Sequence, residues 1–250
     1  MTVDNGGNAR RLLDAATRLL ETVGPEAVQT RRLAADAAVS TMAVYSCFGG
    51  MNGLWDAMVR SGFGLMEAYL ESVPTSGEAA ADLFVVAGAY RRWALSHPQL
   101  YRAMFGLTRP PGRKRPVDVD LTDEATLGAG GPPPAAEGTL DVVVRVLQRL
   151  EGHGIVAGTA PAAAGQFLSA LHGYVLLETG GYFGADGNGL AWVFGPLVLS
   201  LAVGLGVDRA EAERAALTAL LSEHLAEAPG PALEGDDLVD LAGGGPFTRS

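Results

Sequence analysis

The sequence predicts an all-α protein, and three observations support this prediction. Apolar residues recur at helical spacing along most of the chain. Alternating runs of Val, Ile, Thr and Tyr, which are typical of strands, are few. Aromatic residues make up only 7% of the sequence while Ala and Gly are abundant, which suits closely packed helices. With 250 residues, of which 48% are apolar, the chain is long enough to bury a sizeable core.

The first helix is predicted to begin near residue 9 and to end before Gly24-Pro25, because a glycine followed by a proline is a common helix terminus. Two short helices follow over about 31–37 and 41–47, with Thr30 as one N-cap and Ser40 or Thr41 as the other. The apolar positions of the first helix form one continuous face, which consists of Leu12, Ala15, Ala16, Leu19, Leu20 and Val23.

Longer helices are predicted in the rest of the chain. Pro74 ends one of them, and His97-Pro98 separates two others, because the residue before a proline disfavours the helical conformation. The predicted ranges are 51–72, 78–96, 98–106, 137–152, 161–183, 190–204 and 208–227. Residues 107–136 and 229–250 are rich in Pro and Gly and are expected to lie outside the core. The first of these segments carries Arg113, Lys114 and Arg115, which we expect to be solvent-exposed rather than in contact with DNA.

The segment Thr30–Gly49, TRRLAADAAVSTMAVYSCFG, predicts a helix-turn-helix. Its turn is too short for side-by-side packing, so the two helices cross steeply, and the small residues Ala34 and Ala38 let their backbones approach. The residues expected to face inward are Leu33, Ala37, Val39, Val44 and Phe48. The outward face carries Arg31, Arg32, Thr41, Met42, Ala43 and Ser46. This geometry presents the N-terminal part of the second helix to the major groove of DNA.

A wider set of positions fits the same assignment. It comprises Ala15-Ala16 through Gly24, Leu33-Ala34, Ala37-Ala38-Val39-Ser40, Val44-Tyr45 and Phe48. In this order and spacing, over about residues 9–60, the chain resembles the TetR-type repressor family. The resemblance implies a three-helix DNA-binding domain, a partner chain that supplies the second half-site, and a C-terminal body whose effector releases DNA. Ala38 stands where that family usually has Gly, and Met51 stands where it usually has a phosphate-contacting Lys.

The C-terminal part carries a second resemblance. Its residues are Ala89-Tyr90, Trp93-Ala94, His97-Pro98, Leu100-Tyr101, Met104-Phe105-Gly106 and Leu171-His172-Gly173. They are similar to the ligand-domain subgroup that is named for its Trp-His-Gly pattern. Leu171 stands in this chain where that pattern has Trp.

The residues expected to contact DNA are Thr30, Arg31, Arg32, Ser40, Thr41, Met42, Ala43, Tyr45 and Ser46. Hydroxyls and helix N-terminal amides suit phosphates, so Thr30, Ser40 and Tyr45 are assigned to the DNA backbone. The others on the second helix face base edges, where Met42 and Ala43 contact thymine methyl groups. Arg32 is assigned to a guanine or a phosphate. The alternative is that Arg31 and Arg32 form a solvated face and that Tyr45 is part of the core.

The body is expected to bind a small apolar ligand and to form a homodimer. A pocket between its helices would be lined by Tyr90, Trp93, Phe105, His172, Tyr182 and Phe183. The alternative is ordinary core packing around one satisfied histidine. Two long helices are expected to form a four-helix bundle with those of a second copy, which matches a palindromic site by its twofold symmetry. The expected interface residues are Phe167, Leu168, Leu171, Val175, Leu217 and Leu221.

The net charge of −10 does not exclude DNA as a partner. Residues 1–60 contain six Arg and six acidic residues, so the excess negative charge lies entirely in the remaining part. An acidic body is repelled by phosphates while local Arg contacts still form. We therefore expect a DNA-binding domain at 9–60, a ligand-binding and dimerisation domain at 61–228, and a disordered tail at 229–250.

Several other functions are disfavoured. Leu190–Val207 is uncharged over 18 residues, but three glycines and Pro196 favour a core or interface helix over a membrane span. Cys47 is the only cysteine, and the N-terminus lacks the apolar segment of a signal peptide, so a cytoplasmic location is expected. A redox sensor based on Cys47 would lack a resolving thiol in the same chain. We find no catalytic motif and no histidine pair with metal-ligand spacing, so neither an enzyme nor a cofactor is expected.

Overall fold

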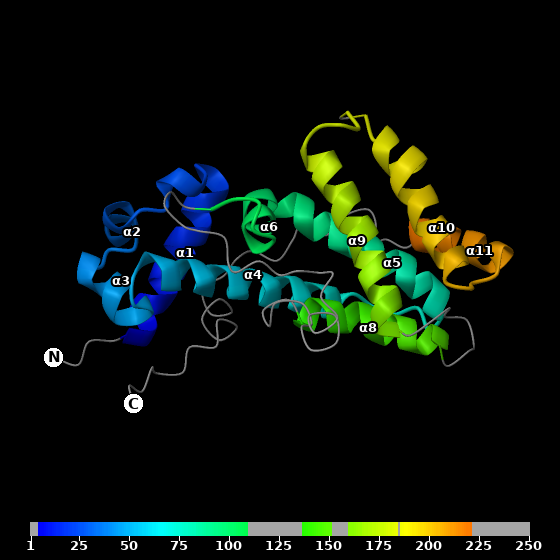
Figure 1. Ribbon diagram of the computed structural model, residues 1–250, viewed down its shortest axis with the longest axis horizontal. Helices are drawn as coiled ribbons and strands as arrows, with labels where there is room; N and C mark the ends of the chain where they lie inside the picture. The colour runs from blue at the N-terminus through cyan, green and yellow to red at the C-terminus, as the bar shows by residue number, and fades with distance from the viewer. Residues whose placement is uncertain (1–4, 110–136, 152–159, 185, 222–250) are drawn as a thin grey trace, which may run out of the picture. The chain divides into compact units, whose positions relative to one another are not determined.

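The computed structural model describes residues 5–109, 137–151, 160–184 and 186–221, and these residues form helices without any strand (Figure 1). This confirms the predicted all-α class. The helices are α1 (Asn5–Thr22), η1 (Pro25–Ala27), α2 (Thr30–Asp36), α3 (Thr41–Phe48), α4 (Met51–Ser72), α5 (Ala79–Ser96), α6 (Pro98–Met104), α8 (Glu137–Glu151), α9 (Ala160–Thr179), the π-helical turn η3 (Leu190–Phe194), α10 (Gly195–Gly204) and α11 (Arg209–Leu221).

The helix boundaries follow the sequence prediction closely, with three exceptions, the first of which is that α1 begins at Asn5 rather than near residue 9. The prediction of Thr30 as an N-cap is wrong: Thr30 is the first helical residue of α2, and Gln29, with extended backbone, is the N-cap. The helix α9 ends at Thr179 rather than at residue 183, because Gly180 and Gly181 follow and Gly181 has a φ of +80°. The basic run 113–115, the proposed tail 229–250 and the predicted continuation of α11 beyond residue 221 lie outside the described residues.

The described chain divides into two compact units, each with its own core. The first, which we call the head, contains residues 5–65 and 97–109. The second, which we call the body, contains residues 66–96, 138–151, 160–184 and 186–221. The helix α6 therefore groups with the head, although the sequence prediction placed it in the C-terminal domain. The division into functional domains at residue 60 stays a prediction.

The core of the head is built around α1, which packs against α2, α3 and α6. Its fully buried side chains include Leu12, Leu20, Leu33, Val44 and Leu54. The half-buried carboxylate of Glu21 accepts hydrogen bonds from the backbone N–H groups of Gln99 and Leu100, at 3.2 and 2.8 Å. It therefore satisfies two of the amides that an α-helix leaves unpaired at its N-terminus, and so fixes α6 to α1. Burial raises the pKa of Glu21, against the opposing effect of these two hydrogen bonds.

The core of the body is built around α5, which packs against α9, α10 and α11 (Figure 1). Every residue from 81 to 90 in this helix is buried. Two ion pairs join α5 to other helices of the body: Asp82 binds Arg149 of α8, and Arg91 forms two hydrogen bonds with Glu178 of α9, at 2.6 and 2.8 Å. Paired charges of this kind position helices, because breaking one pair leaves an uncompensated charge in a poorly solvated place.

The uncharged stretch Leu190–Val207 is divided between η3, α10 and the following turn. None of the helices in the described ranges is long and apolar enough to cross a membrane. Phe194, Val198 and Ala202 are buried in the body, whereas the side chain of Trp192 is 77% exposed. The stretch is thus partly core and partly an apolar surface.

Candidate nucleic-acid interface

The turn between α2 and α3 is a tight C-terminal cap. The N–H of Val39 donates to the carbonyl of Ala34 at 2.9 Å, and the N–H of Ala38 donates to Ala35 at 3.2 Å. This pair of bonds is the Schellman motif, which places the residue between helix and exit in the left-handed region. That residue is Ala38, with φ +52°, and among the described residues it is the only non-glycine with positive φ. This left-handed conformation explains why the family usually has glycine at this position.

Packing separates the two sides of α3. The side chains of Ala43 and Val44 are buried within the head, while Cys47 and Phe48 are half-buried. The prediction that Ala43 lies on the outward face is therefore wrong: its side chain is only 5% exposed, because it points into the α1–α3 contact rather than away from it. Of the predicted inward residues, Leu33, Ala37 and Val44 are buried, and Val39 is half-buried.

Four residues form the exposed face of α3: Thr41, Met42, Tyr45 and Ser46. Their spacing places them on one side of the helix, in the two turns nearest its N-terminus. The side chains of Met42 and Tyr45 are 68% and 57% exposed. Ser46 Oγ donates to the carbonyl of Ala43 at 3.2 Å, so its hydroxyl proton is used within the helix. An exposed methionine at this place has no packing role within the described head.

Two cations flank this face on α2. Arg31 and Arg32 are exposed, and no described residue forms an ion pair with either. In contrast, Arg18 of α1 is paired with Asp36 of α2 at 2.5 Å. The first two guanidinium groups are thus available to an external anion, whereas Arg18 is already neutralised.

The junction from α3 to α4 is fixed by glycines. Gly49 ends α3 in the left-handed region with φ +69°, and the ring of Tyr45 lies beside Gly50. A Cβ atom on Gly53 would lie 1.9 Å from the carbonyl oxygen of Phe48, which no side chain tolerates. Gly53 was not predicted from the sequence, since a glycine in the first turns of a helix has no distinctive sequence signal. Met51, which replaces the expected Lys, is the first residue of α4 and is half-buried.

Cys47 carries a half-buried thiol on α3. Burial raises its pKa, and a hydrogen bond with Ser46 only partly opposes this effect. A raised pKa keeps the sulfur protonated and unreactive at neutral pH. This disfavours the redox-sensor alternative.

Of the six predicted ligand-lining residues, five belong to the body and one belongs to the head. Tyr90 and Trp93 are fully buried in α5, while Phe105 belongs to the head, where its ring packs against Phe63 and Tyr101 at centroid distances of 5.5 and 4.9 Å. Tyr182 was wrongly placed in a pocket: its side chain is 77% exposed, because the Gly180-Gly181 turn carries it away from the core. His172 is half-buried in α9, and burial lowers its pKa.

Phe183 packs on an aromatic cluster at the end of α9. Its ring stacks on Tyr174 at 5.0 Å, and Phe194 packs on the same ring at 4.8 Å. The hydroxyl of Tyr174 donates to Glu178, and burial, together with that carboxylate, raises the pKa of Tyr174 to about 12. These contacts fix the turn between α9 and η3 by packing, which is the alternative that the sequence analysis had left open for Phe183.

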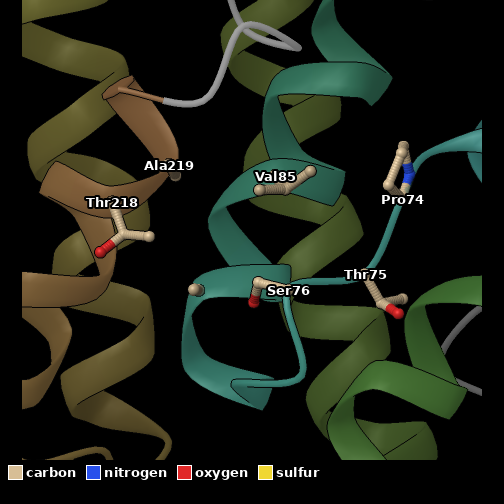
Figure 2. Close-up of a pocket in the computed structure, with 7 residues that line it drawn as sticks. Pro74, Thr75, Ser76, Val85, Thr218 and Ala219 are labelled. Atoms are coloured by element: carbon tan, nitrogen blue, oxygen red, sulfur yellow. The ribbon is translucent and has the colours of Figure 1, made fainter.

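A cavity of about 170 Å³ does occur in the body, at a place that the sequence did not indicate. It lies between the start of α5 and α11, and Figure 2 shows Thr218 and Ala219 opposite Val85 and Ser76. The lining residues are Pro74, Thr75, Ser76, Ala81, Val85, Thr218 and Ala219. Its wall is therefore mainly apolar, with three hydroxyl groups. None of the predicted ligand-lining residues contributes to it.

Two family models match the chain and cover most of it. Residues 12–58 match the model for bacterial regulatory proteins of the tetR family, and residues 83–201 match the model for the tetracyclin repressor-like C-terminal domain. The chain belongs to the TetR family. The first match includes the whole helix-turn-helix described above, and the recognition made from the sequence is confirmed. The Trp-His-Gly subgroup stays a prediction.

Individual relatives agree with this assignment. An uncharacterised HTH-type transcriptional regulator of Mycobacterium tuberculosis is 37% identical over 131 residues, which are 52% of this chain and 50% of that protein. The match thus spans about half the length of this curated relative. A solved protein of unknown function from Rhodococcus sp. RHA1 is 28% identical, with a TM-score of 0.61, over 80% of this chain and 95% of that one. A TetR-family regulator from Pectobacterium atrosepticum, 22% identical, shares the fold, with a TM-score of 0.57, over 83% and 98% of the chains.

The six predicted dimer residues of this TetR-family chain differ in burial. Phe167, Leu171 and Val175 are fully buried within the single chain, so their prediction as interface residues is wrong. They face the core, because α9 packs that side against α5. Leu168 is half-buried, and Leu217 is 60% exposed. The side chain of Leu221 lies outside the described residues.

The exposed apolar surface of the body lies elsewhere. Apart from Leu217, it comprises Leu177 at the end of α9, Tyr182 in the following turn, and Leu190, Trp192 and Val193 in η3. We call these five residues the apolar edge. Leu177 was not predicted, and Tyr182 was predicted to line a pocket. The uncharged run that contains Leu190, Trp192 and Val193 was predicted to be a core or interface helix, since an apolar run alone does not tell one from the other. Family membership indicates a regulator rather than an enzyme.

Proposed function

We propose that this TetR-family chain is a transcriptional regulator that binds a palindromic DNA operator as a homodimer. The proposal further takes it to be a repressor that a small, largely apolar effector releases from DNA. The observation that carries the DNA-binding part is the exposed face of α3, with Thr41, Met42, Tyr45 and Ser46 held on a capped helix-turn-helix. In this motif the second helix enters the major groove with its N-terminal residues against base edges.

The distribution of charged residues also supports binding of DNA through the head. Arg31 and Arg32 are exposed beside α3 and have no carboxylate partner among the described residues, so they can neutralise phosphates. The hydroxyl of the exposed Tyr45 can donate to a third phosphate while its ring stays beside Gly50. The acidic remainder of the chain is repelled by DNA, which favours binding through the head.

A homodimer is supported by the apolar edge. Five exposed apolar side chains in one region of a body are unusual for a monomer, and they give a second copy a place to pack. On α9, Gly165, Ser169 and Gly173 are also exposed, and a Cβ added to either glycine would meet no atom within 4 Å. Small residues at this spacing let a second helix approach closely. We therefore assign the interface to the exposed face of α9 and to η3, rather than to the buried stripe of α9 and to α11.

The assigned interface is tested by the oligomeric state of Trp192→Glu, measured by sedimentation equilibrium. A charge placed on the apolar edge should shift the dimer to monomer without unfolding it, because the native side chain is 77% exposed. Val23→Glu is the matched control, since Val23 is also an exposed apolar residue but lies in the head. Equal dimer dissociation constants for the two variants would refute the assigned interface.

An effector is supported by the cavity of Figure 2. A cavity of about 170 Å³ with a mainly apolar wall suits a molecule of roughly the size of benzene. The hydroxyls of Ser76 and Thr218 already donate to Asp82 and to the carbonyl of Arg214, at 2.7 and 3.0 Å, so the wall offers a ligand mainly apolar contact. A ligand that binds one conformation better than another shifts the population toward it, and this is how an effector releases DNA. The alternative is a DNA-binding regulator without an effector, and filling the cavity by Ala219→Phe while DNA release is followed distinguishes the two.

The DNA-binding proposal is tested by selection from random double-stranded DNA at two salt concentrations. A palindrome should be enriched, with lower affinity at the higher salt concentration. Tyr45→Phe and Arg32→Ala should each weaken binding by about tenfold, since a hydrogen bond to a charged group contributes about 1.5–3 kcal/mol. Arg214→Ala, which removes an exposed cation from α11 of the body, is the matched control and should not change affinity. A folded dimer that enriches no sequence would refute the proposal.

A further inference from the structure

The helix α3, which the proposed function places in the major groove, has an unusual composition for a helix that contacts bases. The residues of α3 are TMAVYSCF, and none of them is Arg, Lys, Asn, Gln, Asp or Glu. Those six types include every side chain that recognises a base by paired or charge-assisted hydrogen bonds: Arg and Lys bind guanine, Asn and Gln bind adenine, and the acids accept from cytosine. Base recognition by α3 must therefore depend on another property of the bases.

The hydroxyl groups on the exposed face are weak discriminators. Ser46 uses its proton in the 3.2 Å bond to Ala43, which leaves only acceptor capacity. A single hydroxyl of Thr41 fits several base edges, so it distinguishes them poorly. The two cations nearby belong to α2, and in a helix-turn-helix this first helix crosses the DNA backbone. Arg31 and Arg32 are therefore placed for phosphates.

Met42 is the remaining candidate for recognition. It is 68% exposed on the first turn of α3, the part of the helix that reaches deepest into the groove. Its side chain is apolar, unbranched and polarizable, so it adapts to a small apolar group. The only apolar group that base pairs present in the major groove is the C5-methyl group of thymine.

We propose that this chain recognises its operator through C5-methyl groups, with Met42 packed on a thymine methyl in each half-site and with 5-methylcytosine accepted at the same place. This inference rests on the proposed function, since it requires that α3 enters the major groove. The recognised feature is the methyl group itself. Uracil, which lacks it, should be rejected although its hydrogen-bonding groups are those of thymine.

The test uses the full-length protein and the selected operator in three forms. In the first, deoxyuridine replaces one thymidine position in both half-sites. In the second, a C·G pair replaces the T·A pair at this position, and in the third that cytosine carries a 5-methyl group. Each methyl group removed should weaken binding by about fourfold, the contribution of one buried group of that size. The methylated cytosine should recover about the same factor relative to unmethylated cytosine.

Variants at Met42 assign the effect to this residue. Met42→Ala should bind the thymine and uracil operators equally, whereas Met42→Leu should still prefer thymine because it keeps an apolar side chain of similar size. Both variants should fold, since the side chain is exposed. Ser46→Ala is the control on the same face and should leave the thymine preference unchanged. Folding is checked by circular dichroism before affinities are measured by fluorescence anisotropy.

The possible failures are distinguishable. If the parent protein enriches and binds an operator but binds its uracil form equally well at every position, methyl recognition is refuted while DNA binding stands. A thymine preference that persists in Met42→Ala would refute the assignment to Met42. If no duplex is bound at all, the proposed function itself fails.

Discussion

Ala38 makes the helix-turn-helix less stable than a glycine at the same position would. It occupies the left-handed region at φ +52°, where a Cβ atom costs about 1–2 kcal/mol and glycine pays no such penalty. The side chain is exposed, so replacing it removes no packing. Glycine loses more conformational entropy on folding, by about 0.4–1 kcal/mol, which offsets part of the gain. We therefore expect Ala38→Gly to raise the free energy of unfolding of the head by about 1 kcal/mol as the net of these effects.

The matched control is Ala35→Gly, three residues earlier. Ala35 is also exposed but lies within α2, where glycine costs about 1 kcal/mol, so the same substitution should have the opposite sign. Urea unfolding followed by circular dichroism measures both variants, and amide hydrogen exchange over residues 30–48 localises the change to the head. The Schellman bonds of Ala38 and Val39 should be retained in Ala38→Gly. A variant at Ala38 that is no more stable than the parent would refute the left-handed assignment.

Three further predictions concern packing, charge and pH. Gly53→Ala should destabilise the head by about 1–3 kcal/mol, because its Cβ would lie 1.9 Å from the Phe48 carbonyl oxygen. Gly204→Ala in α10, whose Cβ would meet nothing within 4 Å, should be neutral or stabilising in urea unfolding, and equal effects of the two variants would contradict this. Arg149→Met should destabilise the body by about 3 kcal/mol, more than Asp82→Asn does, because it leaves the buried Asp82 carboxylate without its cation. In Asp82→Asn the remaining charge is Arg149, which is 39% exposed and can be screened by solvent. The reverse order in urea unfolding would show that the pair is not coupled in this way. His172→Gln should flatten the pH dependence of stability. Burial lowers the pKa of His172 below its ordinary 6.5, so the unfolded chain binds the proton more readily than the folded chain. The contribution of the neutral His172 to stability is therefore present above pH 6.5 and is lost as the pH falls toward the folded pKa. If this histidine contributes nothing, the unfolding free energies of the parent and of His172→Gln will follow parallel curves between pH 7.5 and pH 5.

Periodicity was enough to predict the helices because each has a face that must be buried. The helix α4 has the bounds that Pro74 and the apolar pattern indicated, and α3 differs by a single residue from its prediction. The failure at Thr30 has a local cause: a hydroxyl residue before an apolar run resembles an N-cap, yet Gln29 precedes it with extended backbone and takes that place. Caps depend on one residue's conformation, and a pattern spread over a whole helix does not determine that conformation.

Burial on a helix was harder to predict than the helix itself. Phe167, Leu171 and Val175 form the apolar stripe that a dimer interface also requires, but within one chain α5 covers them. An apolar stripe indicates that something packs there and does not indicate whether the neighbour is the same chain. The apolar edge shows the same ambiguity, because Leu190 and Trp192 belong to a run without charges that fits a core helix and an interface helix equally well. The turn after α9 determines which of them remain exposed.

The head combines weak backbone attraction with apolar base recognition, and the two properties fit each other. Arg31 and Arg32 are the exposed cations beside α3 that have no carboxylate partner in the described head, and Met51 offers no charge at the start of α4. Few phosphate contacts mean a shallow dependence of affinity on salt, since each neutralised phosphate adds about 0.9 to the logarithmic slope. A protein with little non-specific attraction needs less hydrogen-bonding discrimination to avoid wrong sites, because specificity is a difference between two affinities. Met42 contributes only to the specific affinity, so an uncharged reading helix discriminates well when the competing electrostatic affinity is small.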